Sequence, residues 1–497
     1  MHSTPPGRLW WYAAFGLALL VRVPLLAEKP FWRDEAWVAT LVEAPLTRVV
    51  DGQPRPVPLG FLTLARATRV LPLSPEVAYR LPSLACGLAL LPALAALAVA
   101  LGARGVVPLV VTWLAAGLPA LVYYSRELKP YGFDALLAAL APLLALHLFG
   151  RAAGPQLAPR RAGAALLAAL VAAPWFSFGA VFAIAALLAW GWLAWWRGAA
   201  PAARRWWIAA SVAFAASLAL CFRVALAAQS TSPTLRSTWR SFRFVDAPGS
   251  LVAHAADALW RYASLSITFV FPDLWWVAVP LVALGALTWA RGGRALLGWM
   301  MVVPGLAAVG AALADRYLLA HGRLLLFGAP PLILAAAAGL VLVCHRLSPA
   351  RGPHAALAAS AALAIAWSTA ALAHRLPPLL NHSDYFRYDT VHEVAPLIDA
   401  VAPHLAAGDP VFIAQYATKA SLYYGRGRVS QATLCREPCD LRAGLQEWAR
   451  SLRSRGWLIV TDDERTTVDQ VLDAAGISPR LARAARGAAL LEVQPGG

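Results

Sequence analysis

Long apolar runs, separated by short polar segments, fill the first three quarters of the sequence. Eleven of them approach the roughly twenty residues that a helix needs to cross the hydrocarbon layer of a membrane. They are residues 9–26, 82–101, 105–123, 133–149, 162–176, 178–196, 206–227, 275–290, 295–313, 323–344 and 355–373. This pattern predicts a polytopic α-helical membrane protein with about eleven spans, thirteen being the upper bound.

Composition agrees with the pattern and excludes an ordinary cytoplasmic enzyme. Of the 497 residues, 60% are hydrophobic and 14% are charged, whereas about a quarter of the residues of a water-soluble protein are charged. The net charge of +17 is not the signature of a nucleic-acid-binding protein, because the basic residues stand in short clusters between the apolar runs. No nucleic-acid partner is expected.

The arginine clusters predict the orientation of the chain. If the N-terminus is cytoplasmic, the cytoplasmic segments contain arginines but neither Asp nor Glu, in agreement with the positive-inside rule. These arginines are Arg8, Arg104, Arg151, Arg160, Arg161, Arg197, Arg204, Arg205, Arg291, Arg294, Arg346 and Arg351. The acidic residues of the membrane region fall on the opposite side, which indicates that the outer face performs the chemistry.

Three outer segments are too long to be simple connections. Residues 27–80 predict two short amphipathic helices, near 34–47 and 57–71, and residues 228–274 include an apolar stretch suited to the membrane interface. Because the number of spans is odd, the last segment, 374–497, is also expected outside. Residues 1–373 are therefore interpreted as the membrane module.

The C-terminal segment has the composition of a soluble α/β domain. It holds 14 of the 26 acidic residues, and buried strands are predicted at 409–416 and 456–462 between amphipathic helices. We expect it to cap the outer face and to shape an acceptor site. Outside the cytoplasm, Cys435 and Cys439 are expected to form a disulfide rather than a metal site.

Acidic and basic residues gather where spans meet the outer face. Asp34 and Glu35 follow the first span; they could cap a helix, or they could hold a carboxylate at the membrane boundary as a general base. Further groups contain Arg126, Lys129 and Asp134 before the fourth span, and Arg323 at the tenth. A solvated turn or a snorkelling arginine explains each group separately, whereas one chemistry explains them together.

The chemistry that we expect there is sugar transfer from a lipid carrier. Outside the cytoplasmic membrane there is no pool of nucleotide sugars, so the donor is a sugar linked to a polyprenyl phosphate, and no nucleotide cofactor is expected. The enzyme needs cations at the interface to stabilise the departing phosphate and a carboxylate to take the proton of the acceptor hydroxyl.

The same motifs resemble the GT-C membrane glycosyltransferases of the family 39 type, which include protein O-mannosyltransferases and the lipid A aminoarabinose transferase. The matching segments are Trp32-Arg33-Asp34-Glu35, Arg80-Leu81-Pro82-Ser83, Tyr124-Ser125-Arg126-Glu127-Leu128-Lys129-Pro130-Tyr131 with Asp134, and Gly322-Arg323-Leu324-Leu325 with Pro330. They occur in order and with similar spacing over residues 9–345.

The resemblance implies a role for each matching residue. Asp34 would be the catalytic base, supported by Glu35. The donor phosphate would contact a set of basic residues, namely Arg55, Arg80, Arg126, Lys129 and Arg323. Some family members use a divalent metal ion on the outer face, for which Asp134 and His254 are the candidate ligands.

The sequence therefore predicts an inverting glycosyltransferase of the cytoplasmic membrane. It would move a hexose or pentose from a polyprenyl phosphate to a hydroxyl of a lipid, glycan or protein in the cell envelope. Two alternatives stay open. One is a ligase or polymerase with a pyrophosphate-linked donor, which the arginines at 236, 240 and 243 would suit; the other is a secondary transporter or flippase.

Overall fold

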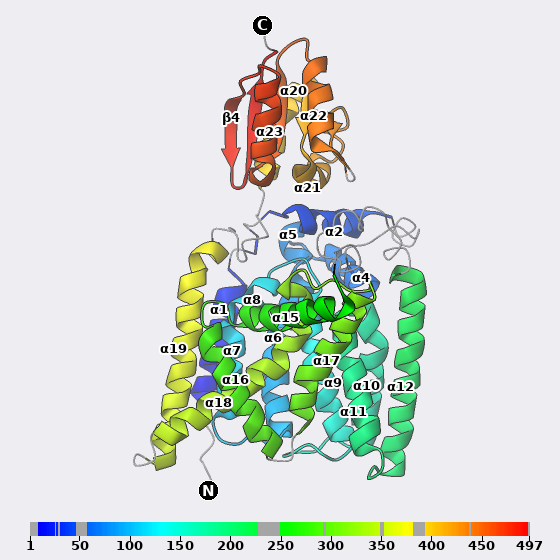
Figure 1. The fold of residues 1–497 in the computed structure, drawn as a ribbon, viewed down its shortest axis with the longest axis vertical. Helices are drawn as coiled ribbons and strands as arrows, with labels where there is room; N and C mark the ends of the chain where they lie inside the picture. The colour runs from blue at the N-terminus through cyan, green and yellow to red at the C-terminus, as the bar shows by residue number, and fades with distance from the viewer. Residues whose placement is uncertain are drawn as a thin grey trace.

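The protein consists of a bundle of helices and an α/β domain at one end of it (Figure 1). The computed structural model describes residues 8–24, 26–27, 30–45, 57–226, 249–291, 295–347, 352–380, 393–436 and 439–495. Arg55 and the arginines at 236, 240 and 243 lie outside the described residues.

Each of the eleven predicted apolar runs contains a helix of the bundle. The run at 105–123 is broken in two, because Pro119 lacks an N–H and pushes Leu118 into an extended conformation. The helices are α1 (Arg8–Arg22), α6 (Leu81–Ala100), α7 (Val107–Gly117), α8 (Pro119–Tyr124), α9 (Tyr131–Leu148), α10 (Pro159–Phe176), α11 (Ala180–Trp190), α12 (Pro201–Cys221), α16 (Trp275–Arg291), α17 (Ala295–Leu313), α18 (Ala329–Leu347) and α19 (Gly352–Leu380).

Several of these helices meet the requirements of a membrane span on their own. Among the described residues, five stretches are long and apolar enough, namely Pro75–Ala100, Tyr131–Leu148, Pro201–Ala225, Ala295–Leu313 and Gly322–Leu347. The protein is therefore a multi-pass membrane protein. The total of about eleven spans stays a prediction, because within the described residues the other apolar helices do not meet these requirements on their own.

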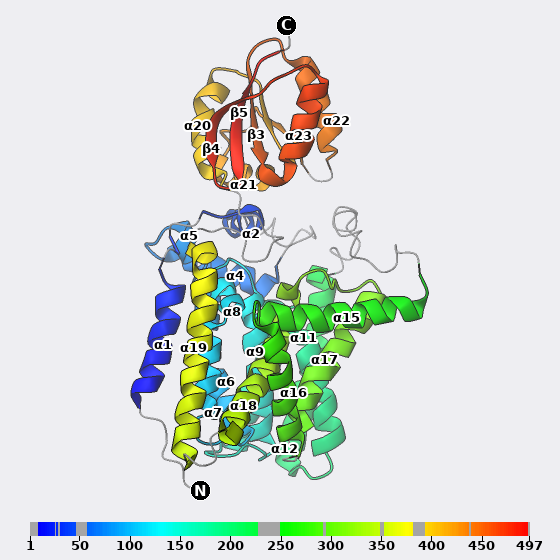
Figure 2. The ribbon, with the colours of Figure 1, turned by 60° about the vertical axis from the view of Figure 1, so that its left-hand side comes forward.

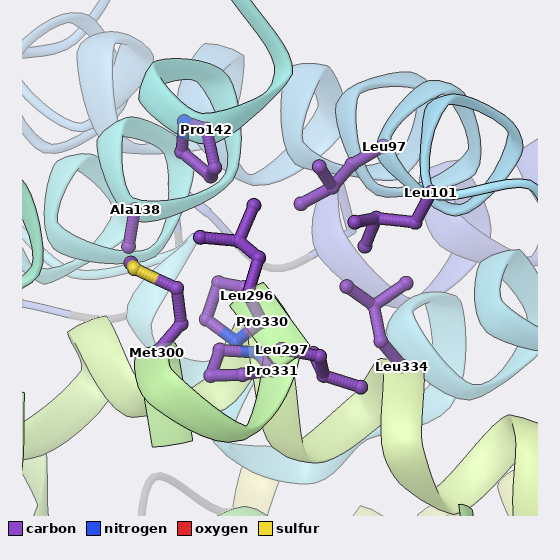
Figure 3. A pocket seen from close by; sticks show the side chains of 10 residues that line it. All are labelled: Leu97, Leu101, Ala138, Pro142, Leu296, Leu297, Met300, Pro330, Pro331 and Leu334. Atoms are coloured by element: carbon purple, nitrogen blue, oxygen red, sulfur yellow. The ribbon is translucent and has the colours of Figure 1, made fainter. Parts of the chain in front are cut away.

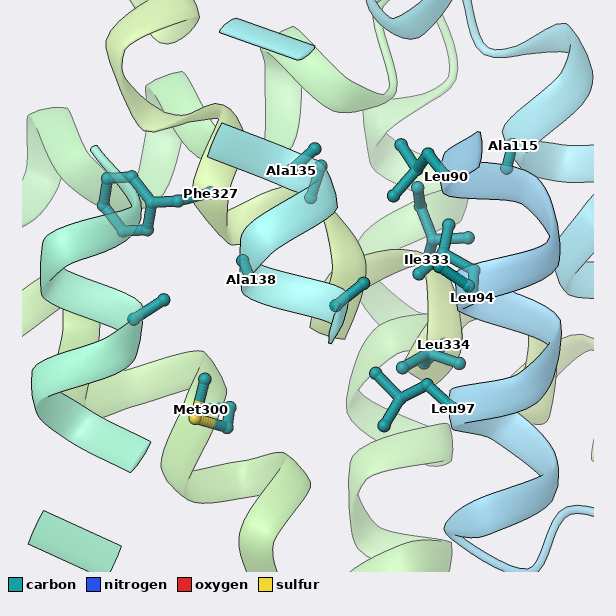
Figure 4. Packing of buried hydrophobic residues seen from close by; sticks show 14 of the residues in the cluster. Leu90, Leu94, Leu97, Ala115, Ala135, Ala138, Met300, Phe327, Ile333 and Leu334 are labelled. Carbon is teal, nitrogen blue, oxygen red and sulfur yellow. The ribbon is translucent and has the colours of Figure 1, made fainter. Parts of the chain in front are cut away.

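Apolar side chains fill the centre of the bundle. Figure 4 shows Leu90, Leu94 and Leu97 of α6 beside Ile333 and Leu334 of α18, and all five belong to one buried cluster. Because lipid tails are as apolar as these side chains, close packing rather than the exclusion of water holds the helices together.

Glycines allow α16 and α18 to approach each other closely. A Cβ atom on Gly339 of α18 would lie 2.0 Å from the carbonyl oxygen of Leu281, and one on Gly285 of α16 would lie 1.9 Å from that of Ala335. Both contacts are with backbone atoms, which a rotamer change cannot move. Small residues are therefore required at this helix crossing.

Short helices cover the end of the bundle that faces the α/β domain. In the segment 27–80, the predicted amphipathic helices are α2 (Arg33–Glu43) and α4 (Leu59–Ala67), followed by a 3₁₀ turn (Thr68–Val70) and α5 (Pro75–Ala78). Later in the chain, α15 (Leu251–Val270) makes an angle of 105° with α16. It lies across the end of the bundle (Figure 2), as expected for the apolar stretch within 228–274.

The C-terminal domain contains a five-stranded sheet in the order β2-β1-β3-β5-β4. The strands are β1 (Val411–Ile413), β2 (Thr433–Leu434), β3 (Gly456–Thr461), β4 (Arg480–Ala485) and β5 (Ala488–Val493). Strand β1 pairs in parallel with β2 and β3, and the hairpin β4–β5 adds antiparallel pairs at the other edge. The predicted strands within 409–416 and 456–462 are β1 and β3.

Helices cover both faces of this sheet. Figure 2 shows α20 (Ala395–Ala406) on one side and α22 (Leu441–Ser451) and α23 (Asp462–Ala474) on the other. The helix α21 (Gln415–Gly425) and the hairpin β4–β5 are additions to the sequence prediction. The hairpin escaped prediction because the residues of β4 are mostly exposed and show no apolar alternation.

Two cysteines of the domain are bonded to each other. Cys435 and Cys439, the predicted pair, form a disulfide with their Cα atoms 5.5 Å apart. It closes the short loop between β2 and α22. The remaining cysteines, Cys86, Cys221 and Cys344, are buried in the bundle with free thiols.

The C-terminal domain shares a hydrophobic core with the short helices of the bundle. Ala36 of α2 and Phe61 of α4 belong to the same buried cluster as Leu397 of α20 and Ala417 and Ala420 of α21. Because alternating residues of the central strands face α20 and α21, this core extends from the sheet to α2. The domain is packed on α2 and not merely linked to the bundle.

A pocket inside the bundle is lined only by leucine, alanine, proline and methionine side chains, from α6, α9, α17 and α18 (Figure 3). None of these residues is a candidate for chemistry. The candidate residues Asp34 and Glu35 lie instead on α2, at the end of the bundle.

The glycine contacts generate a first prediction. Replacing Gly339 by alanine should force α16 and α18 apart and lower the free energy of unfolding by about 1–3 kcal/mol, the usual cost of overpacking. The matched control is Gly298→Ala on α17, where a Cβ atom meets nothing within 4 Å. Thermal unfolding in detergent micelles, followed by tryptophan fluorescence, compares the two variants. Equal melting temperatures would contradict the close crossing.

Candidate active site

The Asp34–Glu35 pair lies in the first turn of α2, which crosses the end of the bundle (Figure 1). Neighbouring residues of a helix point about 100° apart, so the two carboxylates face different surroundings. The side chain of Glu35 is fully buried, whereas that of Asp34 remains 24% exposed. Only Asp34 is accessible to a substrate.

Glu35 forms a buried ion pair with Arg80, which precedes α6. Its two oxygens accept hydrogen bonds from Arg80 at 2.8 and 2.7 Å, and Oε1 also accepts one from the backbone N–H of Leu128 at 2.7 Å. Arg80 further donates to the carbonyl oxygen of Leu26 at 2.7 Å. Because Arg80 is fully buried in these contacts, its guanidinium links α2 to the bundle.

Two buried cations surround the exposed carboxylate. The Nζ atom of Lys129 lies 3.5 Å from Oδ2 of Asp34, and a terminal nitrogen of Arg323 lies 3.7 Å from the same oxygen. Lys129 comes from the loop before α9, and Arg323 from the 3₁₀ helix Gly322–Gly328 before α18. The guanidinium of Arg323 also lies 6.0 Å from the centre of the Tyr131 ring.

This surrounding controls the charge of Asp34. Burial alone would favour its protonated form, but the neighbouring cations outweigh burial and hold the pKa of Asp34 well below its usual range. In decreasing order of effect, these cations are Lys129, Arg323, Arg33 and Lys419. Asp34 is therefore ionised at neutral and mildly acidic pH.

The loop between α8 and α9 carries Lys129 and is held at several points. The hydroxyl of Ser83 donates to the carbonyl oxygen of Lys129 at 2.8 Å, and the indole N–H of Trp32 donates to Glu127 at 2.7 Å. Arg126 of the same loop is buried, and its Nε atom has no hydrogen-bond partner among the described residues. A buried guanidinium with unused donors suits a negatively charged ligand.

The two residues expected to hold a metal ion have different neighbours. Asp134 of α9 is buried and accepts a hydrogen bond from the hydroxyl of Ser177, which comes shortly before α11. His254 of α15 lies beside Gly249, which comes just before that helix. Among the described residues, no three His, Cys, Asp or Glu side chains form a group that could hold a metal ion. The described residues therefore provide no complete set of ligands for a divalent metal ion, and its presence stays a prediction.

The C-terminal domain adds residues that the sequence analysis did not select. The guanidinium of Arg33 lies 4.3 Å from the centre of the Tyr416 ring, and Nζ of Lys419 lies 3.7 Å from the centre of the Trp37 ring. One sequence signal could have indicated Lys419. Only three of the 43 basic residues are lysines, and two of them, Lys129 and Lys419, act on Asp34.

The ion pair behind Asp34 generates a second prediction. Glu35→Gln should lower the free energy of unfolding by about 3–5 kcal/mol, because it leaves the charge of Arg80 buried and unpaired. The control is Asp257→Asn, which removes an exposed pair with Arg261 on α15 and should change stability by less than about 1 kcal/mol. Melting temperatures in detergent test both; a Glu35→Gln variant as stable as the control would show that the pair does not hold α2.

Comparison with solved structures identifies the overall fold of the protein. No protein-family model matches the sequence, and no curated protein matches it either. The structure is similar to that of ArnT from Cupriavidus metallidurans bound to undecaprenyl phosphate, with a TM-score of 0.57 and 13% sequence identity over 98% of both chains. The apo structure of the same protein gives 0.57 and 14% over the same shares.

An oligosaccharyltransferase from Archaeoglobus fulgidus also matches, over 92% of this chain and 70% of that one, with 12% identity and a TM-score of 0.45. At these identities the similarity to ArnT is one of fold. With its polytopic bundle and its C-terminal α/β domain, the chain has the GT-C fold.

Proposed function

We propose that this protein is a membrane glycosyltransferase that takes a sugar from a polyprenyl-phosphate donor and transfers it to a hydroxyl group. One observation carries the proposal. A partly exposed carboxylate, Asp34, lies within 4 Å of two buried cations, Lys129 and Arg323, at the end of a membrane bundle. A base and an anion-binding centre thus share one site, as the transfer chemistry requires.

The donor phosphate is assigned to Lys129 and Arg323 beside Asp34, and to Arg126 of the loop that carries Lys129. Lys129, Arg323 and Arg126 are buried at the end of the bundle, where the phosphate of a lipid carrier would lie while its prenyl chain stays in the bilayer. The similarity of fold to ArnT, whose structure contains undecaprenyl phosphate, supports this class of ligand. Arg80 is reassigned from the phosphate to the positioning of α2.

The reaction follows from this arrangement as a direct displacement. The acceptor O–H gives its proton to Asp34, and its oxygen attacks the anomeric carbon from the side opposite the phosphate. The bond between that carbon and the phosphate oxygen breaks, and the polyprenyl phosphate leaves with the electron pair and one additional negative charge. Lys129 and Arg323 stabilise that charge. The products are an inverted glycoside, the polyprenyl phosphate and a proton that Asp34 returns to solvent.

The shared cations also explain how Asp34 could act as a base despite its low pKa. In the free protein the positive charges act on the carboxylate alone. A bound phosphate would share the same cations and add a negative charge beside Asp34, and both effects raise the pKa of the carboxyl. The base would therefore become stronger when the donor is in place.

The proposed orientation places this site on the outer face of the cytoplasmic membrane. The N-terminus and the arginine-rich segments would be cytoplasmic, and the C-terminal domain would be extracytoplasmic. The disulfide between Cys435 and Cys439 agrees with an oxidising compartment. No step is assigned to a metal ion, because among the described residues Asp134 and His254 belong to no group of three possible ligands.

A third prediction tests the base. Asp34→Asn keeps the size of the side chain but cannot accept the proton, and it should lower the transfer rate by about two to four orders of magnitude. Asp257→Asn, an exposed change on α15, should retain the wild-type rate. The donor for the assay is identified by mass spectrometry of lipid extracted from the purified protein. An Asp34→Asn variant that transfers sugar at the wild-type rate would exclude Asp34 from the mechanism.

A fourth prediction tests the anion-binding centre. Lys129→Met should weaken the binding of undecaprenyl phosphate by about ten-fold or more, because it removes a charge-assisted contact worth about 1.5–3 kcal/mol. Arg261→Met, which removes a cation from the exposed pair on α15, should leave the affinity unchanged. Binding to the detergent-solubilised proteins is measured by microscale thermophoresis. Equal affinities of the two variants would argue against a phosphate at Lys129.

A further inference from the structure

The C-terminal domain brings a positive charge to the helix that carries Asp34. Lys419 belongs to α21, and its Nζ atom lies 3.7 Å from the centre of the Trp37 ring. Trp37 comes three residues after Asp34, so both side chains lie on neighbouring positions of one face of α2. The ring that holds the ammonium group thus belongs to a residue one helical turn from Asp34, and the charge of Lys419 acts on the carboxylate.

We propose that Lys419 is a positioning residue of the Asp34 site, supplied by the C-terminal domain and held beside the carboxylate by the face of Trp37. This inference rests on the proposed function for its purpose, since it extends the same site. It assigns to the C-terminal domain a direct part in the electrostatics of the reaction, in addition to the shaping of an acceptor site.

The contact is part of a well-defined docking of α21 on α2. Beyond the shared hydrophobic core, the hydroxyl of Tyr424 accepts a hydrogen bond from the backbone N–H of Phe31, and the hydroxyl of Tyr423 donates to Glu43 at 3.1 Å. These contacts lie before and at the end of α2. They hold α21 along the helix, so the position of Lys419 relative to Asp34 is determined by the packing.

The charges that face Asp34 come from each element packed around it. Arg33 lies on its own helix, Lys129 on the loop before α9, Arg323 on the 3₁₀ helix before α18, and Lys419 on α21. Other acidic and basic groups nearby bind partners other than Asp34. Glu35 binds Arg80, Arg66 of α4 donates to the carbonyl oxygen of Val42, and Glu464 accepts hydrogen bonds from Tyr416 and Thr461.

Lys419 has a distinct task among these cations. Lys129 and Arg323 are within 4 Å of Asp34, so a bound phosphate would compete with the carboxylate for them. Lys419 is held on Trp37 and approaches from the side of the domain. It would keep Asp34 ionised, and thus able to accept a proton, while the phosphate occupies the other cations.

The test measures the protonation of Asp34 without any substrate. A hydrophobic carbodiimide modifies carboxyl groups in their protonated form, and mass spectrometry of the full-length protein in detergent locates the modification. For Lys419→Met, the pH of half-maximal modification of Asp34 should rise by about 0.5 to 1, the size of effect expected when one nearby charge is lost close to a protein surface.

Three further variants separate this effect from general damage. Lys419→Arg keeps the charge and should restore the wild-type curve. Arg428→Met removes an exposed cation of the same domain that pairs with Asp399, and should leave the curve unchanged. Trp37→Leu removes the ring that holds Lys419 and should shift the modification curve in the same direction as Lys419→Met. The double variant should show no further shift.

Two measurements distinguish a failure of the inference from a failure of the proposed function. If the curves of Lys419→Met and the wild type coincide, Lys419 does not act on Asp34 and the inference is wrong. Binding of undecaprenyl phosphate to the wild type is measured on the same preparation. A wild type that does not bind this lipid, together with a shifted Lys419→Met curve, would overturn the proposed function and leave the role of Lys419 in place.

Discussion

The buried ion pair between Glu35 and Arg80 determines the geometry of the whole candidate site. It attaches α2, which lies outside the membrane-spanning helices, to the beginning of α6. Two charges removed from water are stable only when their geometry and remaining hydrogen bonds are satisfied, and here Leu128 and Leu26 supply the additional partners. The position of Asp34, one residue earlier, follows from this attachment.

Because of this attachment, the two adjacent carboxylates have different surroundings and different roles. Glu35 faces the bundle and is used for structure, whereas Asp34 faces the cations and remains accessible. The loop that holds Glu35 through the N–H of Leu128 also carries Lys129. The support of α2 and the nearest cation of Asp34 are therefore parts of one short segment, and a change in the first would displace the second.

Helix α2, which carries the proposed base, contacts both the bundle and the C-terminal domain. One side of α2 is held by the bundle through Glu35, and another side shares its core with α20 and α21 of the C-terminal domain. Arg33 and Trp37 extend this second contact through the rings and charges of Tyr416 and Lys419. A ligand that moves the domain would thereby change the surroundings of Asp34.

The sequence by itself determined that the protein is a multi-pass membrane protein, where its apolar helices lie and where the two main strands of the tail lie, and it drew attention to the Asp34–Glu35 segment. These features depend on local hydrophobicity and on charges close together in the chain, which a sequence displays directly. The tertiary structure alone decided which of the two carboxylates is partly exposed and that Arg80 binds Glu35. It also brought Lys419 to α2, 385 residues after Asp34. Such contacts arise from the packing of distant segments, which no local pattern records.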